Sequence, residues 1–488
     1  MSHQNEQNNS SPFSRLVVVS NRLPITVSKN DDSGQWQSGP SIGGLVTALT
    51  SVLKKRKGMW IGWPGITEEV NLDTLLARVG QESGYTLKSI SLTKEEIDSY
   101  YFGFSNEVMW PLFHDIQSNC NFDPAYWYAY QVVNQKFAKA IVENISSNDY
   151  VWVHDYHLVM VAKELRNLGV KNKIGYFLHI PFPSPDAFVR MPWRIQILEA
   201  LLEFDLLGFQ TPRDRNNFVY CVEAVLRGFR VDTRRQVATI KTPQRQIQVG
   251  SFPISIDFNG FTRLSASSKV TNMAAQLRRA MNNRCILLGV DRLDYSKGIP
   301  EKLRAFRNAL ERYDDLHNKV ALIQIVVPSR KDIPGYQSLL AEIEGLVGEI
   351  NGEFSQPGWV PVQYMFRNFE RAEILAYYRA SDVAVITPLK DGMNLVAKEY
   401  CAAHVDNRGV LVLSEFAGAA MQFRKNALLV NPYDIEGIAD ALYRAYQMES
   451  AEQKWRMRKL RRSVARRDVY WWVDFFLQTA ASGMAAPR

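Results

Sequence analysis

Eight short apolar runs constrain the fold of this chain more than any other feature. Each run is followed closely by small or polar residues and then by a helical pattern. The runs with their polar ends lie at 15–24, 149–157, 173–183, 206–211, 285–298, 321–330, 383–392 and 409–418. Nearly continuous Val, Ile and Leu is typical of strands buried on both faces, and alternation with helices predicts parallel α/β sheets. Because ligands bind outside the carboxyl ends of such strands, the polar residues after each run are the candidates for chemistry.

The strand series restarts near the middle of the chain, which at 488 residues is too long for one ordinary core. The stretch 249–261 ends one α/β block, and the run from Cys285 opens the next. We therefore predict an α/β protein of two Rossmann-like domains that face a central cleft, with a C-terminal helix that crosses back to the N-terminal domain. The predicted segments are a disordered tail at 1–13, an N-terminal domain at 14–255, a C-terminal domain at 256–466 and the crossing helix at 467–482.

Charge and cysteine content argue against several classes of protein. The net charge is +8, and the densest basic run, 454–467, is predicted to be a solvated helix. No zinc-finger spacing or RNP-type motif accompanies that run, so we expect no nucleic-acid partner. No apolar run is long enough to span a bilayer, and four scattered cysteines suit a reducing compartment, so we expect a cytoplasmic protein without a membrane partner. The sequence leaves the oligomeric state open, a homo-oligomer included.

The stretch 383–400 combines a buried strand, a turn, a glycine-bearing loop and a helix that is predicted to begin near Asn394. A helix start presents unpaired N–H groups and the positive end of the helix dipole, which suits diphosphate oxygens. Gly392 lets the backbone approach a ligand closely. Asp391 and Glu399 would then accept hydrogen bonds from sugar and ribose hydroxyls. The alternative is that Asp391 is only a turn residue and Glu399 only a surface charge.

Two cations follow the apolar run at 285–298. Arg292 and Lys297 lie five residues apart in a loop that contains glycine and proline, so they can converge on one polyanion. Arginine supplies a planar fork and lysine a point charge, a common division around phosphates. The alternative is an ion pair of Arg292 with Asp291 or Asp294.

The N-terminal half has candidates of its own. Arg22 follows the first predicted strand, and the pair Gly43 and Gly44 opens a helix. Neither G-x-G-x-x-G nor the Walker pattern G-x-x-x-x-G-K-[ST] occurs, which argues against nicotinamide dehydrogenases and P-loop kinases.

The segment at 154–157 raises the question of a metal. Strand alternation places His154 and Asp155 on opposite faces, and further ligands beyond His157 cannot be nominated, so we expect neither a metal ion nor a cofactor. We expect His179, at the end of another strand, to donate a hydrogen bond to a substrate hydroxyl; the alternative is a structural histidine.

Long motifs in a fixed order connect the two halves. They are VVVSNRLP, GGL, WIGWPG, YYFGFSNEVMWPLFH, VWVHDYHL, GYFLHIPFPSP, DLLGFQT, RLDYSKGIPEKL, PSR, TPLKDGMNLVAKEY and FAGAA. Together they resemble the trehalose-6-phosphate synthases, retaining glycosyltransferases of family 20 with the GT-B fold, over residues 14 to 480. The resemblance implies transfer of glucose from UDP-glucose, or from GDP- or ADP-glucose, to glucose 6-phosphate, giving α,α-trehalose 6-phosphate.

The resemblance also implies roles for single residues. Arg292 and Lys297 match the pair that grips the donor diphosphate. The other donor-side residues that it implies are Gly43, Gly44, His179, Asp391, Gly392, Met393, Asn394, Leu395, Val396 and Glu399. The acceptor-side residues are Arg22, Trp63, Tyr101, Trp110, Asp155 and Arg330. One departure is Phe366, where the family's familiar residue is polar, so contacts to the nucleotide base are not carried over.

The implied mechanism has no carboxylate nucleophile, because no Asp or Glu matches the one that most retaining hydrolases use. The diphosphate leaves as the acceptor's 1-hydroxyl enters on the same face. Arg292 and Lys297 stabilise the developing charge in place of a metal, and Asp155, His179 and Asp391 complete the implied catalytic set. Two alternatives stay open: a pseudo-glycosyltransferase that joins a nucleotide-cyclitol to an amino-cyclitol phosphate, and a non-catalytic sugar-phosphate sensor.

Overall fold

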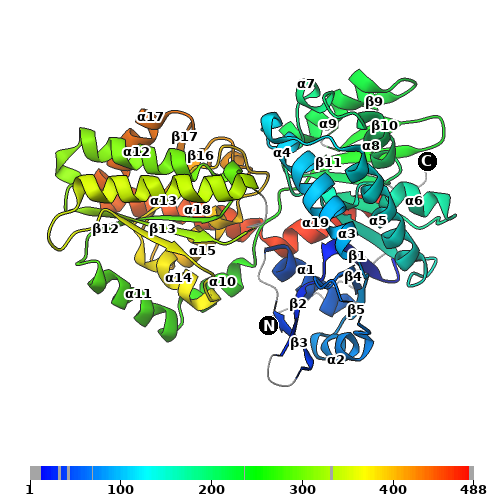
Figure 1. Cartoon of the computed structure of the whole chain (residues 1–488), viewed down its shortest axis with the longest axis horizontal. Helices are drawn as coiled ribbons and strands as arrows, with labels where there is room; N and C mark the ends of the chain where they lie inside the picture. The colour runs from blue at the N-terminus through cyan, green and yellow to red at the C-terminus, as the bar shows by residue number, and fades with distance from the viewer. Residues whose placement is uncertain are drawn as a thin grey trace, which may run out of the picture. The chain divides into compact units, whose positions relative to one another are not determined.

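The computed structural model describes residues 13–30, 34–40, 44–68, 70–235, 237–329 and 334–482 (Figure 1). The predicted tail at 1–13 lies outside this part of the chain, apart from Phe13. Internal contacts divide the chain into two units. Unit 1 holds the described residues up to Phe252 and those from Val473 onward, and unit 2 holds Pro253–Trp472. The chain therefore passes between the units twice.

Unit 1 is built on a nine-stranded sheet with the order β5-β4-β1-β6-β7-β8-β11-β10-β9. Its strands are β1 (Leu16–Arg22), β4 (Met59–Trp63), β5 (Thr86–Ser89), β6 (Tyr150–His154), β7 (Ile174–Phe177), β8 (Leu206–Phe209), β9 (Arg230–Asp232), β10 (Ala238–Lys241) and β11 (Gln246–Ser251). The strands from β5 to β11 pair in parallel, and β10 and β9 pair antiparallel at one edge. A separate antiparallel hairpin joins β2 (Ile25–Lys29) to β3 (Trp36–Pro40).

Helices link the strands of unit 1. They are α1 (Gly44–Arg56), α2 (Asp73–Ser83), α3 (Lys94–Glu96), a π-helix at Ile97–Met109, α4 (Trp110–Phe113), α5 (Pro124–Val142), α6 (Val161–Asn167), α7 (Pro185–Phe188), α8 (Arg194–Leu201) and α9 (Pro212–Val225). The inner strands are buried along their whole length, as their unbroken apolar sequences predict: every residue of β6, β7 and β8 is buried.

Unit 2 contains a six-stranded sheet with the order β14-β13-β12-β15-β16-β17, and all its pairs are parallel. The strands are β12 (Cys285–Arg292), β13 (Val320–Val327), β14 (Val362–Phe366), β15 (Val383–Ile386), β16 (Val410–Ser414) and β17 (Leu428–Val430). The helices are α10 (Phe258–Ser265), α11 (Ser268–Ala280), α12 (Ile299–Arg312), α13 (Pro334–Phe354), α14 (Arg371–Ala380), α15 (Leu395–Ala403), α16 (Ala420–Phe423), α17 (Ile435–Gln447) and α18 (Ser450–Arg466).

Helices cover both faces of this second sheet (Figure 1). Along β12, Ile286 and Leu288 belong to the core that α11, α14 and α15 cover, whereas Leu287 belongs to the core under α12, α13 and α17. Side chains of successive strand residues point to opposite faces, so each strand contributes to two cores. This arrangement explains why the unit 2 strands read as continuous apolar runs.

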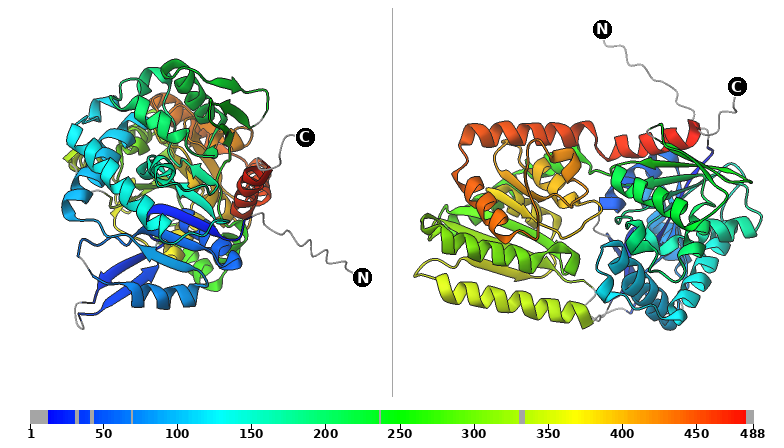
Figure 2. Two further views of the ribbon diagram at one scale, coloured as in Figure 1. Left: turned by 90° about the vertical axis from the view of Figure 1, so that its right-hand side faces the viewer. Right: turned by 90° about the horizontal axis from the view of Figure 1, so that it is seen from above.

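The terminal helix α19 (Val469–Ser482), red in Figure 2, completes the core of unit 1. Its Phe476 ring is stacked on Trp152 at a centroid distance of 4.3 Å and meets Phe252 edge-on at 5.0 Å. A side chain at Gly208 in β8 would collide with the Phe476 ring, so the glycine leaves the room that the helix needs. Trp472 and Phe476 are fully buried, while Trp471 and Phe475 are half-buried.

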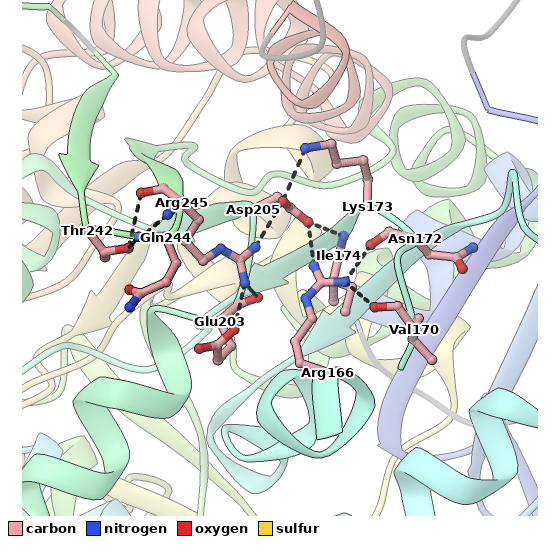
Figure 3. A network of polar contacts seen from close by, with 10 residues as sticks. All are labelled: Arg166, Val170, Asn172, Lys173, Ile174, Glu203, Asp205, Thr242, Gln244 and Arg245. Carbon is pink, nitrogen blue, oxygen red and sulfur yellow. Dashed lines mark hydrogen bonds and ion pairs between the residues drawn. The ribbon is translucent and has the colours of Figure 1, made fainter. Parts of the chain in front are cut away.

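A charged network ties together the amino ends of β7, β8 and β11 (Figure 3). Asp205, just before β8, accepts hydrogen bonds from Arg166 at 2.9 Å, Arg245 at 3.0 Å and the backbone N–H of Ile174 at 2.8 Å, and it also pairs with Lys173 at 3.2 Å. The amino ends of the strands are opposite the carboxyl ends, where the candidate site residues lie. We therefore assign this network to the stability of the sheet and not to the site.

Residues 450–466 form a helix, α18, as predicted for the basic run. In the described ranges, no helix has both the length and the apolar character that crossing a membrane requires.

Candidate active site

Two loops with donor-side candidates meet at the carboxyl edge of the unit 2 sheet. Strands β12 and β15 are parallel neighbours, so the segments that follow them leave the sheet side by side. Lys297, after β12, places Nζ 2.7 Å from Oδ2 of Asp391, which follows β15. The backbone N–H of Leu389 donates to Ser296 O at 2.8 Å, which fixes the two loops to each other. Both charged side chains of the ion pair are nearly buried, with 12% and 11% exposed.

Asp391 organises its own loop. Its Oδ1 accepts hydrogen bonds from the N–H groups of Met393 at 3.0 Å and Asn394 at 3.2 Å, and its Oδ2 accepts one from Asn394 Nδ2 at 3.2 Å. The turn role that we considered as the alternative for Asp391 is therefore present. It leaves the loop rigid, because one carboxylate holds three N–H donors and an ammonium.

Asn394 begins the helix that the sequence predicts. It has a positive φ of 59°, a conformation that asparagine tolerates, and its side chain accepts a hydrogen bond from Ala397 N at 3.1 Å. The amides of Leu395 and Val396 lie in the first turn of α15, where N–H groups have no partner within the helix. The start of α15 thus presents two backbone donors next to Lys297 and Asp391.

Arg292 ends β12 and remains accessible. Its side chain is 48% exposed, and its guanidinium is 3.7 Å from Asp294 Oδ2, which is too far for a hydrogen bond. Of the two ion pairs considered for Arg292, the one with Asp294 is thus present in a weak form. Asp291 instead contacts the buried Lys302 at 2.5 Å and Gln324 at 3.0 Å.

Glu399 lies one turn into α15 and is not a surface charge. Its Oε2 accepts a hydrogen bond from the Tyr378 hydroxyl at 3.0 Å. Burial raises the pKa of Glu399, because the charged form loses solvent, and the Tyr378 hydrogen bond partly opposes this rise. The hydrogen bond from Tyr378 therefore orients the carboxylate.

The unit 1 candidates gather at the carboxyl ends of β6 and β7. Asp155, directly after β6, has a φ of 74°, a strained value for a residue with a side chain. Its N–H donates to Phe177 O at 2.8 Å, and its Oδ1 accepts the N–H of His179 at 3.3 Å. The His154 ring lies beside the His179 ring, with His154 Nδ1 3.1 Å from His179 Nε2.

His154 and Asp155 both contact His179, but through different groups: the His154 ring meets the His179 ring, and the Asp155 carboxylate accepts the His179 backbone N–H. Burial lowers the pKa of His179 to about 3 and the pKa of His154 well below its ordinary value. A neutral imidazole has one N–H and one acceptor nitrogen, so the N–H of one ring can donate a hydrogen bond to the other across the 3.1 Å contact. The described residues contain no group of three or more His, Cys, Asp or Glu placed to hold a metal ion.

Aromatic contacts position the remaining acceptor-side candidates. Arg22 at the end of β1 is paired in register with Trp63 of β4, and its guanidinium lies 4.4 Å from the indole centroid. Tyr101 lies 6.2 Å from Trp63 by ring centroids and is stacked on His157. Trp110 is buried on α4, with its ring centroid 5.7 Å from that of Tyr156, the residue after Asp155.

Two predicted residues lie outside the described part of the chain: Gly43 and Arg330. Gly44 is the first residue of α1, as expected for a glycine that opens a helix. Phe366, the departure from the family pattern, ends β14.

Sequence reasoning missed partners that come from distant segments. Tyr378 on α14 lies in none of the quoted motifs, and only the fold brings it to Glu399. Lys302 on α12 lies within the motif RLDYSKGIPEKL, but its contact with Asp291 was not predicted. His154 was considered for a metal but not as the partner of His179. A polar residue inside an apolar helix face, such as Lys302, was the one signal available beforehand.

The two α/β units, with polar residues at the carboxyl ends of their parallel strands, have the GT-B fold of a glycosyltransferase, as the match to solved trehalose-phosphate synthases shows. The chain belongs to glycosyltransferase family 20, whose family model matches residues 14–482. It is similar to the trehalose-6-phosphate synthase of Mycobacterium leprae, with 42% identity over 480 residues, 97% of this chain and 95% of the relative.

Two solved structures have the same fold over nearly the whole chain. A structure from E. coli, bound with UDP-2-fluoro glucose, has 37% identity and a TM-score of 0.87, and the match covers 97% of this chain and 100% of that one. The α,α-trehalose-phosphate synthase (UDP-forming) of Burkholderia xenovorans in complex with glucose-6-phosphate has 36% identity and a TM-score of 0.85. That match covers 96% and 100% of the two chains.

Proposed function

We propose that the chain is an α,α-trehalose-phosphate synthase that transfers glucose from a nucleotide-glucose, UDP-glucose first among the donors, to glucose 6-phosphate with retention. The observation that carries this proposal is the joining of Lys297, the Asp391 loop and the start of α15 at one edge of the unit 2 sheet. An ammonium, backbone donors and a carboxylate at one place suit a ligand that has both a diphosphate and sugar hydroxyls.

On the donor side, Arg292, Lys297 and the amides of Leu395 and Val396 would bind the diphosphate. Asp391 would accept a hydrogen bond from a glucose hydroxyl in place of one of its four present donors, and Glu399 would bind the ribose hydroxyls. Glu399 is supported by Tyr378, which orients its carboxylate. Gly392, Met393 and Asn394 supply the loop backbone, and Gly43 and Gly44 would close over the diphosphate.

On the acceptor side, the phosphate of glucose 6-phosphate would be bound by Arg22, Tyr101, Trp110 and Arg330. Trp63 holds the Arg22 guanidinium in place by stacking, which leaves the N–H groups at its edge for phosphate oxygens. Asp155 would contact the acceptor sugar, and neutral His179 would hydrogen bond a hydroxyl of the donor glucose. We assign acceptor binding to the domain 14–255, donor binding to the domain 256–466, and the connection between them to the helix 467–482.

The chemistry is a front-face displacement. The bond from the donor's anomeric carbon to the diphosphate oxygen breaks as the acceptor's 1-hydroxyl forms its own bond to that carbon on the same face. The hydroxyl proton passes to the leaving diphosphate. Lys297 and Arg292 stabilise the charge that develops on that group, so positioning and electrostatics carry the catalysis. We propose that no divalent ion is needed and, from the four free cysteines, that the enzyme is cytoplasmic.

The test is an assay of the purified protein with glucose 6-phosphate and each of UDP-, GDP- and ADP-glucose, with EDTA present. Acceptor-dependent release of nucleoside diphosphate, together with a non-reducing disaccharide phosphate, supports the proposal and identifies the donor. Activity that EDTA abolishes and a divalent ion restores would overturn the metal-free mechanism. Donor binding without turnover would point instead to the cyclitol-coupling enzyme or the sensor.

A further inference from the structure

A cationic hollow of about 430 Å³ lies in unit 2, on the described part of the chain, away from the residues assigned above. It is formed where the end of α16, strand β17, and helices α17 and α18 meet. Its charged lining consists of Arg424, Lys425, Arg444, Arg456 and Asp440. The volume falls within the range of small-molecule sites.

Three of the four cations in this hollow have no protein counter-charge. The side chains of Arg424, Lys425 and Arg444 make no hydrogen bond or ion pair with any described residue. Arg456 pairs with Glu452 at 2.7 Å. The single lining carboxylate, Asp440, is already engaged by Arg312 at 2.8 Å and by the Tyr313 hydroxyl at 2.6 Å.

A short segment connects this hollow to the donor loop. The N–H of Gly418 donates to Asp391 O at 2.8 Å, and the N–H of Asp391 donates to Phe416 O at 3.3 Å. A side chain at Gly418 would overlap the carbonyl oxygen of Gly392, so the two loops are in direct contact. From Gly418 the chain runs through α16, anchored by the fully buried Phe423, to Arg424 at the rim of the hollow.

We propose that this hollow is a second ligand site, for a small phosphorylated metabolite, and that its occupancy changes donor affinity through the segment from Gly418 to Arg424. Three unpaired cations favour a multiply charged phosphate over a carboxylate or a neutral ligand. The coupling rests on the proposed donor role of the Asp391 loop, whereas the binding site itself does not. Coupling between sites is reciprocal, so the donor also changes the affinity of the hollow for its ligand.

The experiment measures binding of inorganic pyrophosphate to the full-length protein by calorimetry, with UDP and glucose 6-phosphate present in excess. The wild type is compared with the double variant Arg424→Gln/Arg444→Gln. The matched control is Arg458→Gln/Arg462→Gln, which removes two exposed arginines from α18 outside the hollow. Any competition of pyrophosphate with UDP or glucose 6-phosphate at the proposed substrate sites is the same in all three proteins. A difference in pyrophosphate affinity between them therefore reports on the hollow.

We expect pyrophosphate to bind the wild type and the control with equal affinity, and the Arg424→Gln/Arg444→Gln variant at least tenfold more weakly. Equal affinity in all three proteins would overturn the site. A second titration measures UDP affinity with and without pyrophosphate. We expect pyrophosphate to change the UDP affinity severalfold less in the Arg424→Gln/Arg444→Gln variant than in the control. An identical change in both proteins would overturn the coupling. The four arginines are exposed, so we expect neither double variant to change the melting temperature. Measuring that temperature verifies that each variant folds.

Discussion

Lys297 Nζ lies 2.7 Å from Asp391 Oδ2, so the cation proposed to bind the donor diphosphate and the carboxylate proposed to bind the donor sugar neutralise each other. A nearly buried ion pair of this kind is preorganised, because neither side chain has to find its place when the ligand arrives. The donor would be inserted beside an existing charge pair and would share the ammonium with Asp391.

Lys297→Met should lower kcat/KM about 10²- to 10³-fold, the usual effect of removing one preorganised electrostatic group. It should also leave Asp391 as an uncompensated, nearly buried charge. The effects of Lys297→Met and Asp391→Asn should therefore be far from additive in a double-mutant cycle. The control, Lys319→Met, removes an exposed lysine at the opposite end of the sheet and should leave kcat/KM unchanged. Additive effects would contradict the pairing.

Tyr378→Phe should raise the donor KM about tenfold or more with little change in kcat, since a hydrogen bond to a charged group contributes about 1.5–3 kcal/mol. The reason is that Glu399 would lose the hydroxyl that orients it. The neighbouring Tyr377→Phe is the control, because the Tyr377 hydroxyl has one hydrogen-bond partner among the described residues, the weakly accepting Met365 Sδ at 3.5 Å. Equal effects of the two variants would show that the ring positions, not the Glu399 contact, matter.

Stability should fall on acidification because of His179. Its folded pKa, lowered by burial to about 3, lies below the ordinary value of 6.5, so between these values the unfolded chain binds more protons. The contribution to unfolding free energy is complete above pH 6.5 and is lost as pH falls toward 3, at a slope of up to about 1.4 kcal/mol per pH unit. Urea unfolding between pH 4 and 7 should show a shallower slope for His179→Gln; parallel curves would contradict this assignment.

Lys398 should make the stability of the protein depend on pH in the alkaline range. Its Nζ donates to Ile254 O at 2.7 Å, and burial lowers its pKa to about 7 from 10.5. Between these values the folded chain holds the neutral amine while the unfolded chain stays protonated, so stability should rise with pH from 7 toward 10. Lys398→Met should remove this rise, of up to about 1.4 kcal/mol per pH unit, in urea unfolding at pH 7, 8 and 9. A variant that keeps the wild-type slope would show that another group is responsible.

Asp205→Asn should cost about 2 kcal/mol or more of unfolding free energy, because the network in Figure 3 would lose its central charge. Activity per folded molecule should not change, since Asp205 is at the amino edge of the sheet. The exposed pair of Asp232 with Arg234 provides the control, and Asp232→Asn should have little effect on denaturant midpoints. A fall in kcat for Asp205→Asn would contradict this separation of stability from activity.

Eight strands were predictable because their apolar sequences are buried on both faces, whereas the inner strand β4, also fully buried, lies outside the eight runs. The eight apolar runs coincide with β1, β6, β7, β8, β12, β13, β15 and β16, and only β13 begins one residue before its run. The β2–β3 hairpin, the antiparallel strand β10 and the edge strand β9 beside it were not predicted, since their residues are partly exposed and carry no continuous apolar pattern. An edge strand needs only one neighbour, so its sequence is less constrained.

The convergence of Lys297 with Asp391 could be predicted because both follow strands of a parallel sheet. The details could not, because they depend on backbone angles and on distant residues. The positive φ of Asp155 turns its carboxylate toward His179, and nothing in an apolar run followed by His and Asp indicates that angle. Likewise, Tyr378 reaches Glu399 only because α14 packs against α15.

The position of Phe476 has a consequence for the order in which the molecule can form on the ribosome. Its ring fills the space beside Trp152 and Gly208 in unit 1, yet it is synthesised after every residue of unit 2. Domains generally fold as they emerge, beginning at the N-terminus. Here the first unit to emerge must wait, with that aromatic surface uncovered, until the second has been translated in full.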